Sequence, residues 1–143
     1  MSAVHYRQAS VADLPGMALS RLADAGTGPT DPRIAAYLLG KTPRVAYVAL
    51  RGPEVVGYIG GHLTRRYGCD GELRYLFVAP AHRRRGVAGV LLQLLATWFR
   101  DHAARRICIH VEPANVAARR FCRRHGAGEL NRYWLVWQDV GAE

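Results

Sequence analysis

Hydrophobic and polar residues change their spacing near the middle of the chain. Residues 72–78 are rich in aromatic and branched side chains and are followed by Ala79 and Pro80, which predicts a strand ended by proline. Beyond them, apolar residues recur at helical spacing, at Val87, Val90, Leu91, Leu94, Leu95 and Trp98. Because these residues fall on one face of an α-helix, they predict a helix that ends near Arg100.

The same patterning predicts further strands on both sides of this unit. They are residues 6–9, 45–50, 55–63, 106–111, 128–130 and 133–137. The turn 51–54 joins two of them into a β-hairpin. Strands in antiparallel succession, followed by alternating strands and helices, predict one mixed α/β (α+β) domain that spans residues 1–143.

About four helices should flank this sheet. Ser10 can cap the first of them, and Asp13 in its first turn suits the helix dipole. A second helix should run from Pro32 or Arg33 to about Leu39. The helix after residue 86 is the third, and Asn115 is the predicted N-cap of the fourth.

The segment 82–92 joins the central strand to its helix and has the features of an anion-binding turn. Gly86 and Gly89 have no Cβ, so a bulky anion can approach their backbone. The first turn of the helix directs free N–H groups and the positive end of its dipole to the same place, where phosphate binds well. No Lys-Ser, Lys-Thr or G-x-G-x-x-G follows, so the two common nucleotide-binding loops are excluded.

Two motifs make the chain similar to the GNAT superfamily of acyl-CoA-dependent N-acyltransferases. Residues 83–88 match its pyrophosphate loop, Q/R-x-x-G-x-G/A, as R-x-x-G-x-A. Residues 115–127 resemble its segment N-x-x-A-x-x-F/L-Y-x-x-x-G-F, with Cys122 in place of the usual tyrosine and Ala127 in place of phenylalanine. The resemblance covers roughly residues 44–138. It implies a mostly antiparallel central sheet in which one parallel pair of strands splays apart.

The resemblance also implies acetyl-CoA as the co-substrate. Its pyrophosphate would bind at the turn, and its pantetheine arm would lie between Asn115 and the main chain of the central strand. The residues expected to contact it are Phe77, Val78, Arg83, Arg84, Arg85, Gly86, Val87, Ala88, Gly89, Asn115, Ala118 and Phe121.

Glu72 is the first candidate for the general base that deprotonates the acceptor amine. Several branches of the superfamily carry a glutamate at this place, at the start of the central strand. Regular alternation puts Glu72 on the face of Arg74, Leu76 and Val78, so an ion pair with Arg74 or with a solvent-exposed arginine is the structural alternative. Glu112, directly after the second central strand, is the second candidate.

Cys122 occupies the position where related enzymes use tyrosine to protonate the departing CoA thiolate. Its side chain is too short to reach the place of a phenol oxygen, and proton transfer needs hydrogen-bond contact or one bridging water. We therefore expect Cys122 to pack as a small apolar residue and water or another tyrosine to act as the acid.

Charge and composition narrow the classes of partner. The net charge of +9 comes almost wholly from arginine, since Lys41 is the only lysine. Clusters at 83–85 and 119–124 suit a cofactor with three phosphate groups. No stacking stripe or recognition-helix motif is present, so nucleic acid is the last choice of partner. Three dispersed cysteines and six unpaired histidines predict no metal site.

The sequence therefore predicts an N-acetyltransferase in which a primary amine, of a small molecule or a peptide, attacks acetyl-CoA directly in a ternary complex. The alternative is a GNAT-like module that binds CoA but has lost catalysis. No stretch has the length and hydrophobicity of a membrane span or a signal peptide, which favours the cytoplasm. The acceptor and a homodimer are left open.

Overall fold

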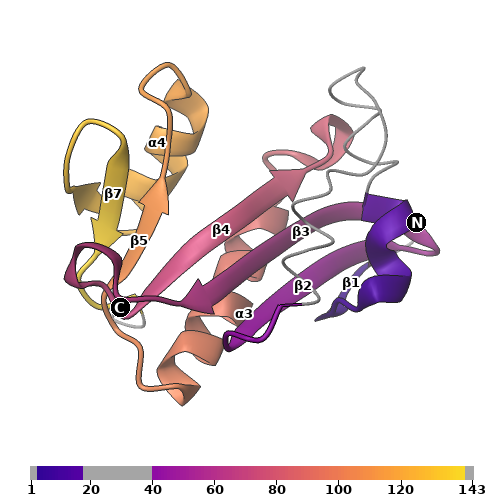
Figure 1. Cartoon of the computed structure of the whole chain (residues 1–143). Coiled ribbons are helices and arrows are strands. Elements are labelled where there is room, and N and C mark those ends of the chain that lie inside the picture. Colours follow the sequence, from indigo (N-terminus) through magenta and orange to yellow (C-terminus); the bar gives the residue numbers. More distant parts are fainter. Residues whose placement is uncertain (1–2, 18–39, 141–143) are drawn as a thin grey trace.

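A seven-stranded sheet forms the centre of the computed structural model, which describes residues 3–17 and 40–140 (Figure 1). Its strand order is β1-β2-β3-β4-β5-β7-β6. The strands are β1 Val4–Gln8, β2 Arg44–Arg51, β3 Glu54–Leu63, β4 Gly71–Val78, β5 Ile107–His110, β6 Gly128–Glu129 and β7 Trp134–Trp137. Neighbouring strands are antiparallel except β4 and β5, which are parallel. The mixed, mostly antiparallel α/β sheet with one parallel pair is thereby confirmed.

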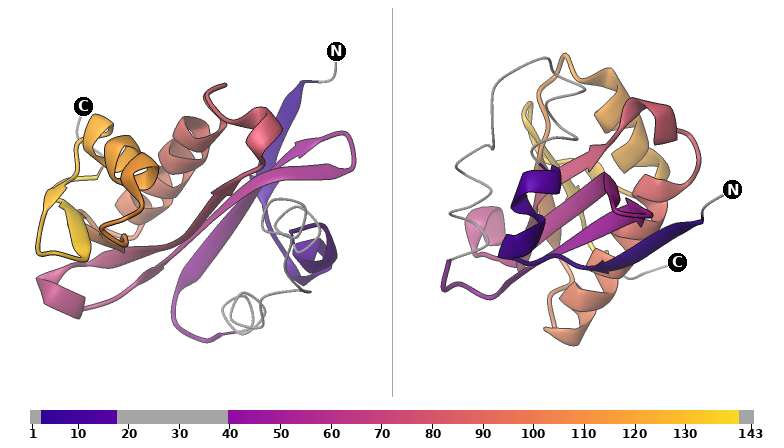
Figure 2. Two further views of the ribbon diagram at one scale, coloured as in Figure 1. Left: turned by 90° about the horizontal axis from the view of Figure 1, so that it is seen from above. Right: turned by 90° about the vertical axis from the view of Figure 1, so that its right-hand side faces the viewer.

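Helices cover both faces of this sheet. Helices α3 (Val87–Asp101) and α4 (Val116–Arg124) lie on one side, and the helical residues 14–17 lie on the other (Figure 2). Three of the four expected helices thus fall, wholly or in part, among the described residues. The helix expected at 32–39 lies outside them. Short 3₁₀ turns occur at Val11–Asp13, Arg66–Gly68 and Pro80–His82.

The apolar face predicted for α3 is the one that packs on the sheet. Val87, Leu91, Leu92, Leu95 and Phe99 are all buried there. Two glycines of the strands below let the helix approach closely: a Cβ added to Gly71 would lie 2.4 Å from Phe99 Cε1, and one added to Gly61 would lie 2.8 Å from Phe99 Cζ. The close approach of α3 therefore depends on glycine at both positions.

The chain turns into the first helical segment at an ion pair. Arg7 binds both carboxylate oxygens of Asp13, at 2.9 and 2.7 Å, and the Ser10 N–H donates to the same carboxylate at 2.8 Å. These hydrogen bonds, first that from Arg7, hold the pKa of Asp13 below its ordinary value. Ser10 and Asp13 thus mark the start of a helical segment, as predicted.

Strand β4 contains a β-bulge that its sequence pattern does not announce. Gly60 pairs with Tyr75 and Gly61 with Leu73, so Arg74 is an extra residue without a partner on β3. The bulge inverts the alternation of side chains. Leu73, Leu76 and Val78 pack on the α3 side, and Tyr75 packs on the opposite side. The prediction that Glu72 shares a face with Leu76 and Val78 is therefore wrong, because Glu72 neighbours Leu73 and points away from α3.

Candidate active site

Strands β4 and β5 pair over only three residues and then diverge. The parallel ladder ends at Leu73 and Ile109, although β4 continues to Val78, and the two strands separate like the arms of a V (Figure 1). Between them is an open cavity of about 490 Å³. Its lining comes from β3, β4, β5, α4 and the segment between β5 and α4: Tyr58, Leu73, Arg74, Tyr75, Leu76, Ile109, His110, Val111, Glu112, Asn115, Ala118, Phe121 and Cys122. The cavity is large enough for an extended chain between the strands.

The main chain of β4 faces this opening at alternate residues. The Ala79 N–H donates to the Val56 carbonyl of β3 at 2.8 Å. Because alternate residues of an antiparallel strand direct their N–H and C=O groups to the same neighbour, those of Phe77 also point to β3. The N–H and C=O groups of Leu76 and Val78 point to the opposite edge, toward the opening. Arg83 confirms this orientation, since its Nε donates to the Val78 carbonyl at 2.9 Å. Leu76, which the sequence did not single out, is therefore a second candidate for main-chain contact beside the predicted Val78.

The turn before α3 has the backbone of an anion site. Arg84 and Gly86 have φ angles of 63° and 84°, in the left-handed region, and Gly86 is the N-cap residue of α3. The first hydrogen bond of the helix runs from the Val90 N–H to the Gly86 carbonyl, so the amides of residues 87–89 have no partner within the helix. A Cβ added to Gly86 would meet no atom within 4 Å. This space beside free amides and three arginines fits a phosphate group.

Helix α4 begins where the sequence predicted it. The Asn115 Oδ1 accepts the Ala118 N–H at 3.2 Å, which confirms the N-cap role. Asn115, Ala118 and Phe121 also line the cavity, on the wall opposite β4. The amide of Asn115 can thus cap the helix through Oδ1 while its nitrogen is available to donate a hydrogen bond to a ligand.

Cys122 packs as expected. It is 1% exposed, belongs to the main hydrophobic core and forms part of the inner wall of the cavity. Burial raises the pKa of its thiol to about 11, so the thiol stays protonated at neutral pH. Ala127, the other departure from the motif, is also buried in this core.

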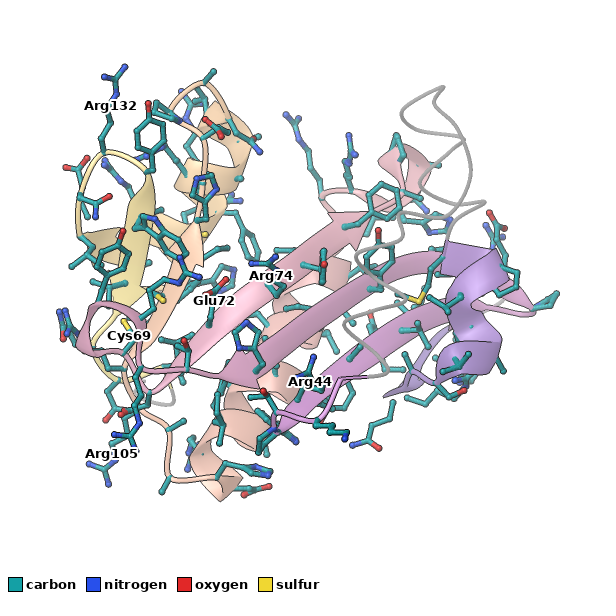
Figure 3. The ribbon with its side chains drawn as sticks, in the orientation of Figure 1. Arg44, Cys69, Glu72, Arg74, Arg105 and Arg132 are labelled. Carbon is teal, nitrogen blue, oxygen red and sulfur yellow. The ribbon has the colours of Figure 1, made fainter. Side chains whose placement is uncertain are left out.

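Glu72 lies one residue before the strands separate and is 2% exposed. Its Oε2 is 3.4 Å from Nη1 of Arg74, which lies beside it in Figure 3. The same oxygen is 3.9 Å from His62 Nε2, and Oε1 is 3.3 Å from Arg66 Nε. The ion pair with Arg74 is therefore present. Neither Arg66 nor His62 was predicted as a neighbour, because both come from the loop end of β3, and only the folded sheet brings them to Glu72.

Glu112 is in a different setting from Glu72. Its side chain is 66% exposed at the β5 wall of the cavity, 3.9 Å from His110 Nε2. The imidazole of His110 stacks on Tyr133 with a ring separation of 6.0 Å. The two candidate bases thus differ in their surroundings: Glu72 on β4 is buried beside two arginines, and Glu112, after the end of β5, is open to solvent.

Comparison with known proteins agrees with this geometry. The sequence model of the acetyltransferase (GNAT) family matches residues 17–127, and the chain belongs to that family. No curated protein matches the sequence. Among the residues that the structure describes, no group of three His, Cys, Asp or Glu side chains is arranged to hold a metal, and no helix has the length and hydrophobicity to cross a membrane.

Solved structures share the fold at low sequence identity. The ribosomal-protein-S18-alanine N-acetyltransferase of Escherichia coli is 14% identical with a TM-score of 0.78, over 99% of this chain and 96% of that one. The aminoglycoside N-acetyltransferase AAC(6′)-Iy in complex with CoA is 23% identical with a TM-score of 0.78, over 92% of each chain. Arabidopsis thaliana NAA60 in complex with acetyl-CoA is 16% identical with a TM-score of 0.71, over 94% and 98%.

Proposed function

We propose that the protein is an N-acetyltransferase that uses acetyl-CoA and a primary amine in a ternary complex. The observation that carries this proposal is the open main-chain edge of β4, which leads directly to the unpaired amides at the start of α3. Strand edge and helix start together can hold an extended chain that ends in a pyrophosphate. The CoA complexes of structures with the same fold support this use of the cavity.

Each part of the cavity has a role in holding the co-substrate. The amides of residues 87–89 bind the pyrophosphate, with charge from Arg84 and Arg85. The main chain of Leu76 and Val78 pairs with the pantetheine arm, and Asn115 closes on it from α4. Arg83 already donates to Val78, so it positions the turn against the strand. Phe77 is assigned no contact with the co-substrate, since its main chain is directed to β3 and its side chain is buried in the core with Met17.

The bound acetyl-CoA supplies an activated thioester, and the protein supplies the proton transfers. Glu72, buried beside the cavity-lining Arg74, is the proposed base and would take the amine proton through a water molecule, while Glu112 is the second candidate. The thiolate receives its proton from water or from a tyrosine of the cavity wall, Tyr58 or Tyr75. Cys122 takes no part in proton transfer, because it is buried and its thiol is separated from the main chain by a single methylene group.

A second function is favoured by one observation, the cysteine at the position of the usual tyrosine. On this alternative the protein binds CoA without catalysing transfer. The two functions separate in one assay, in which the purified protein is incubated with acetyl-CoA and a panel of primary amines while release of free thiol is followed. Amine-dependent thiol release that exceeds the rate without protein supports the enzyme. CoA binding without any release supports the binding module.

A further inference from the structure

Positive charge exceeds negative charge around Glu72, and this excess bears on the chemical class of the acceptor substrate. Arg66, Glu72 and Arg74, here called the Arg66–Glu72–Arg74 cluster, contain two guanidinium groups and one carboxylate. Arginine is always charged in proteins, so with Glu72 ionised the cluster has a net charge of +1. Among residues 3–17 and 40–140, Glu72 is the only carboxylate within ion-pair distance of either arginine.

The arginines of the cluster are accessible, whereas the carboxylate is not. The side chains of Arg66 and Arg74 are 50% and 41% exposed, and that of Glu72 is 2% exposed. Arg74 also lines the cavity between β4 and β5, and Figure 3 shows it beside Glu72 on the same side of β4. A guanidinium has five N–H donors, so one contact with Glu72 leaves capacity for a second carboxylate in bidentate geometry.

Both guanidinium groups are held by aromatic rings. Arg66 lies over the Trp134 ring, 5.0 Å from its centroid, and Tyr67 packs edge-on against the same ring. Arg74 lies 5.8 Å from the ring centroid of Tyr75, the next residue of β4. Fixed guanidinium groups lose little conformational freedom when they bind an anion, so these contacts favour a binding site over a solvated surface.

We propose that the acceptor is an amine that carries a carboxylate close to its amino group, as an amino acid does, and that Arg74 with Arg66 binds this carboxylate. The inference rests on the proposed acetyltransferase function and adds the substrate class. The nucleophilic form of such an acceptor has a neutral amine and one carboxylate, and its charge of −1 complements the cluster.

The same charges also favour the reactive form of the amine. Positive charge near an ammonium group favours its deprotonation, which acetyl transfer requires. An acceptor with several ammonium groups and no acid would instead be repelled by the cluster. Glu112 on the opposite wall repels a carboxylate placed there, so the acid has to lie at the β4 wall, beside Arg74.

The proposal is tested by binding, without turnover. Isothermal titration of the CoA-loaded protein compares N-acetyl amino acids of varied side chain with their amides, which differ only in the carboxylate. We expect the tightest-binding acid to lose at least about tenfold in affinity on amidation, the loss typical of a charge-assisted hydrogen bond. Equal affinity of every acid and its amide, or no binding of any acid at about 10 mM, overturns the proposal.

Matched arginine variants assign the preference to the cluster. Arg74→Gln should reduce the ratio of acid to amide affinity to within about threefold of unity, and Arg74→Lys should retain part of it. Arg51→Gln, which removes the same charge from the exposed end of the β2–β3 hairpin, should leave the ratio unchanged. If Arg74→Gln unfolds, Arg66→Gln provides the same comparison. A ratio preserved in both cluster variants refutes the assignment.

Thiol release from acetyl-CoA with the free amino acids is measured separately. Acid-selective binding without any thiol release would contradict the proposed acetyl transfer but support the acceptor site. Thiol release that is equally fast with amino acids and their amides would support acetyl transfer and contradict the acceptor site. The two proposals therefore fail in distinguishable ways.

Discussion

Replacing Gly71 with alanine should destabilise the protein by crowding two buried side chains, those of Phe99 and Ile107. The added Cβ would lie 2.4 Å from Phe99 Cε1 and 3.0 Å from Ile107 Cδ1, whereas ordinary contacts begin at 3.4 Å. The Phe99 ring therefore has to move by about 1 Å, although it is fully buried between α3 and the sheet. Overpacking of this kind costs about 1–3 kcal/mol.

Part of that cost is offset in the unfolded state. Alanine restricts the unfolded chain more than glycine does, which stabilises the folded state by about 0.4–1 kcal/mol, and the φ of Gly71 is not in the left-handed region. The net loss should be about 1–2 kcal/mol of unfolding free energy, or about 3–6 °C in Tm for a chain of this length. Thermal and urea unfolding followed by circular dichroism measure it.

Gly128→Ala is the matched control, because a Cβ there would meet no atom within 4 Å and β6 is exposed. It should change the unfolding free energy by less than about 0.5 kcal/mol. Adding Phe99→Leu to Gly71→Ala should relieve the clash, so the double variant should lose less stability than the sum of the two single variants. Equal stability of Gly71→Ala and Gly128→Ala would refute the steric argument.

Four further predictions concern the site. Gly86→Val should weaken CoA binding at least about tenfold in isothermal titration, because the side chain would fill the space beside the α3 amides; unchanged affinity would exclude this turn as the pyrophosphate site. Glu72→Gln should lower kcat by about 100-fold and alter its pH profile, while a wild-type rate would transfer the role to Glu112 or to water. Cys122→Ala should change turnover by less than about tenfold, and a thousandfold loss with intact CoA binding would show that the thiol reacts. Alkylation of Cys122 in the wild-type protein should stay slow at neutral pH and accelerate as the pH approaches its pKa of about 11.

Much of the fold was predictable because its signals are local. The helical spacing from Val87 gave the start of α3 correctly and its end to within one residue, since a buried face requires an apolar side chain every three or four residues. The Asn115 cap and the β2–β3 hairpin followed from residue types at single positions. The parallel pairing of β4 with β5, in contrast, came from the family resemblance and not from spacing.

The surroundings of Glu72 were predictable only in part. Arg74 is only two residues from Glu72 on the same strand, so their ion pair could be considered from the sequence alone. The bulge at Arg74 has no compositional signal, because an extra residue changes the pairing without changing residue type. Arg66 and His62 reach Glu72 from the end of β3 and the turn that follows, and such contacts depend on the three-dimensional path of the chain.

The bulge at Arg74 also gives β4 one residue more than a regular ladder with β3 requires. A substitution at this position leaves the side chains on either side of it in their present phase. Deleting Arg74 would make Leu73, opposite Gly61, and Tyr75, opposite Gly60, consecutive residues, so regular alternation would keep Leu73 on the α3 side and Tyr75 on the other. The main-chain groups of Leu76 and Val78 would still face the opening. The regular ladder of β1 with β2 has no such extra residue, and a deletion there would turn one segment to the wrong face of the sheet. Loss of one residue at the bulge should therefore be tolerated better than loss of one residue from β1.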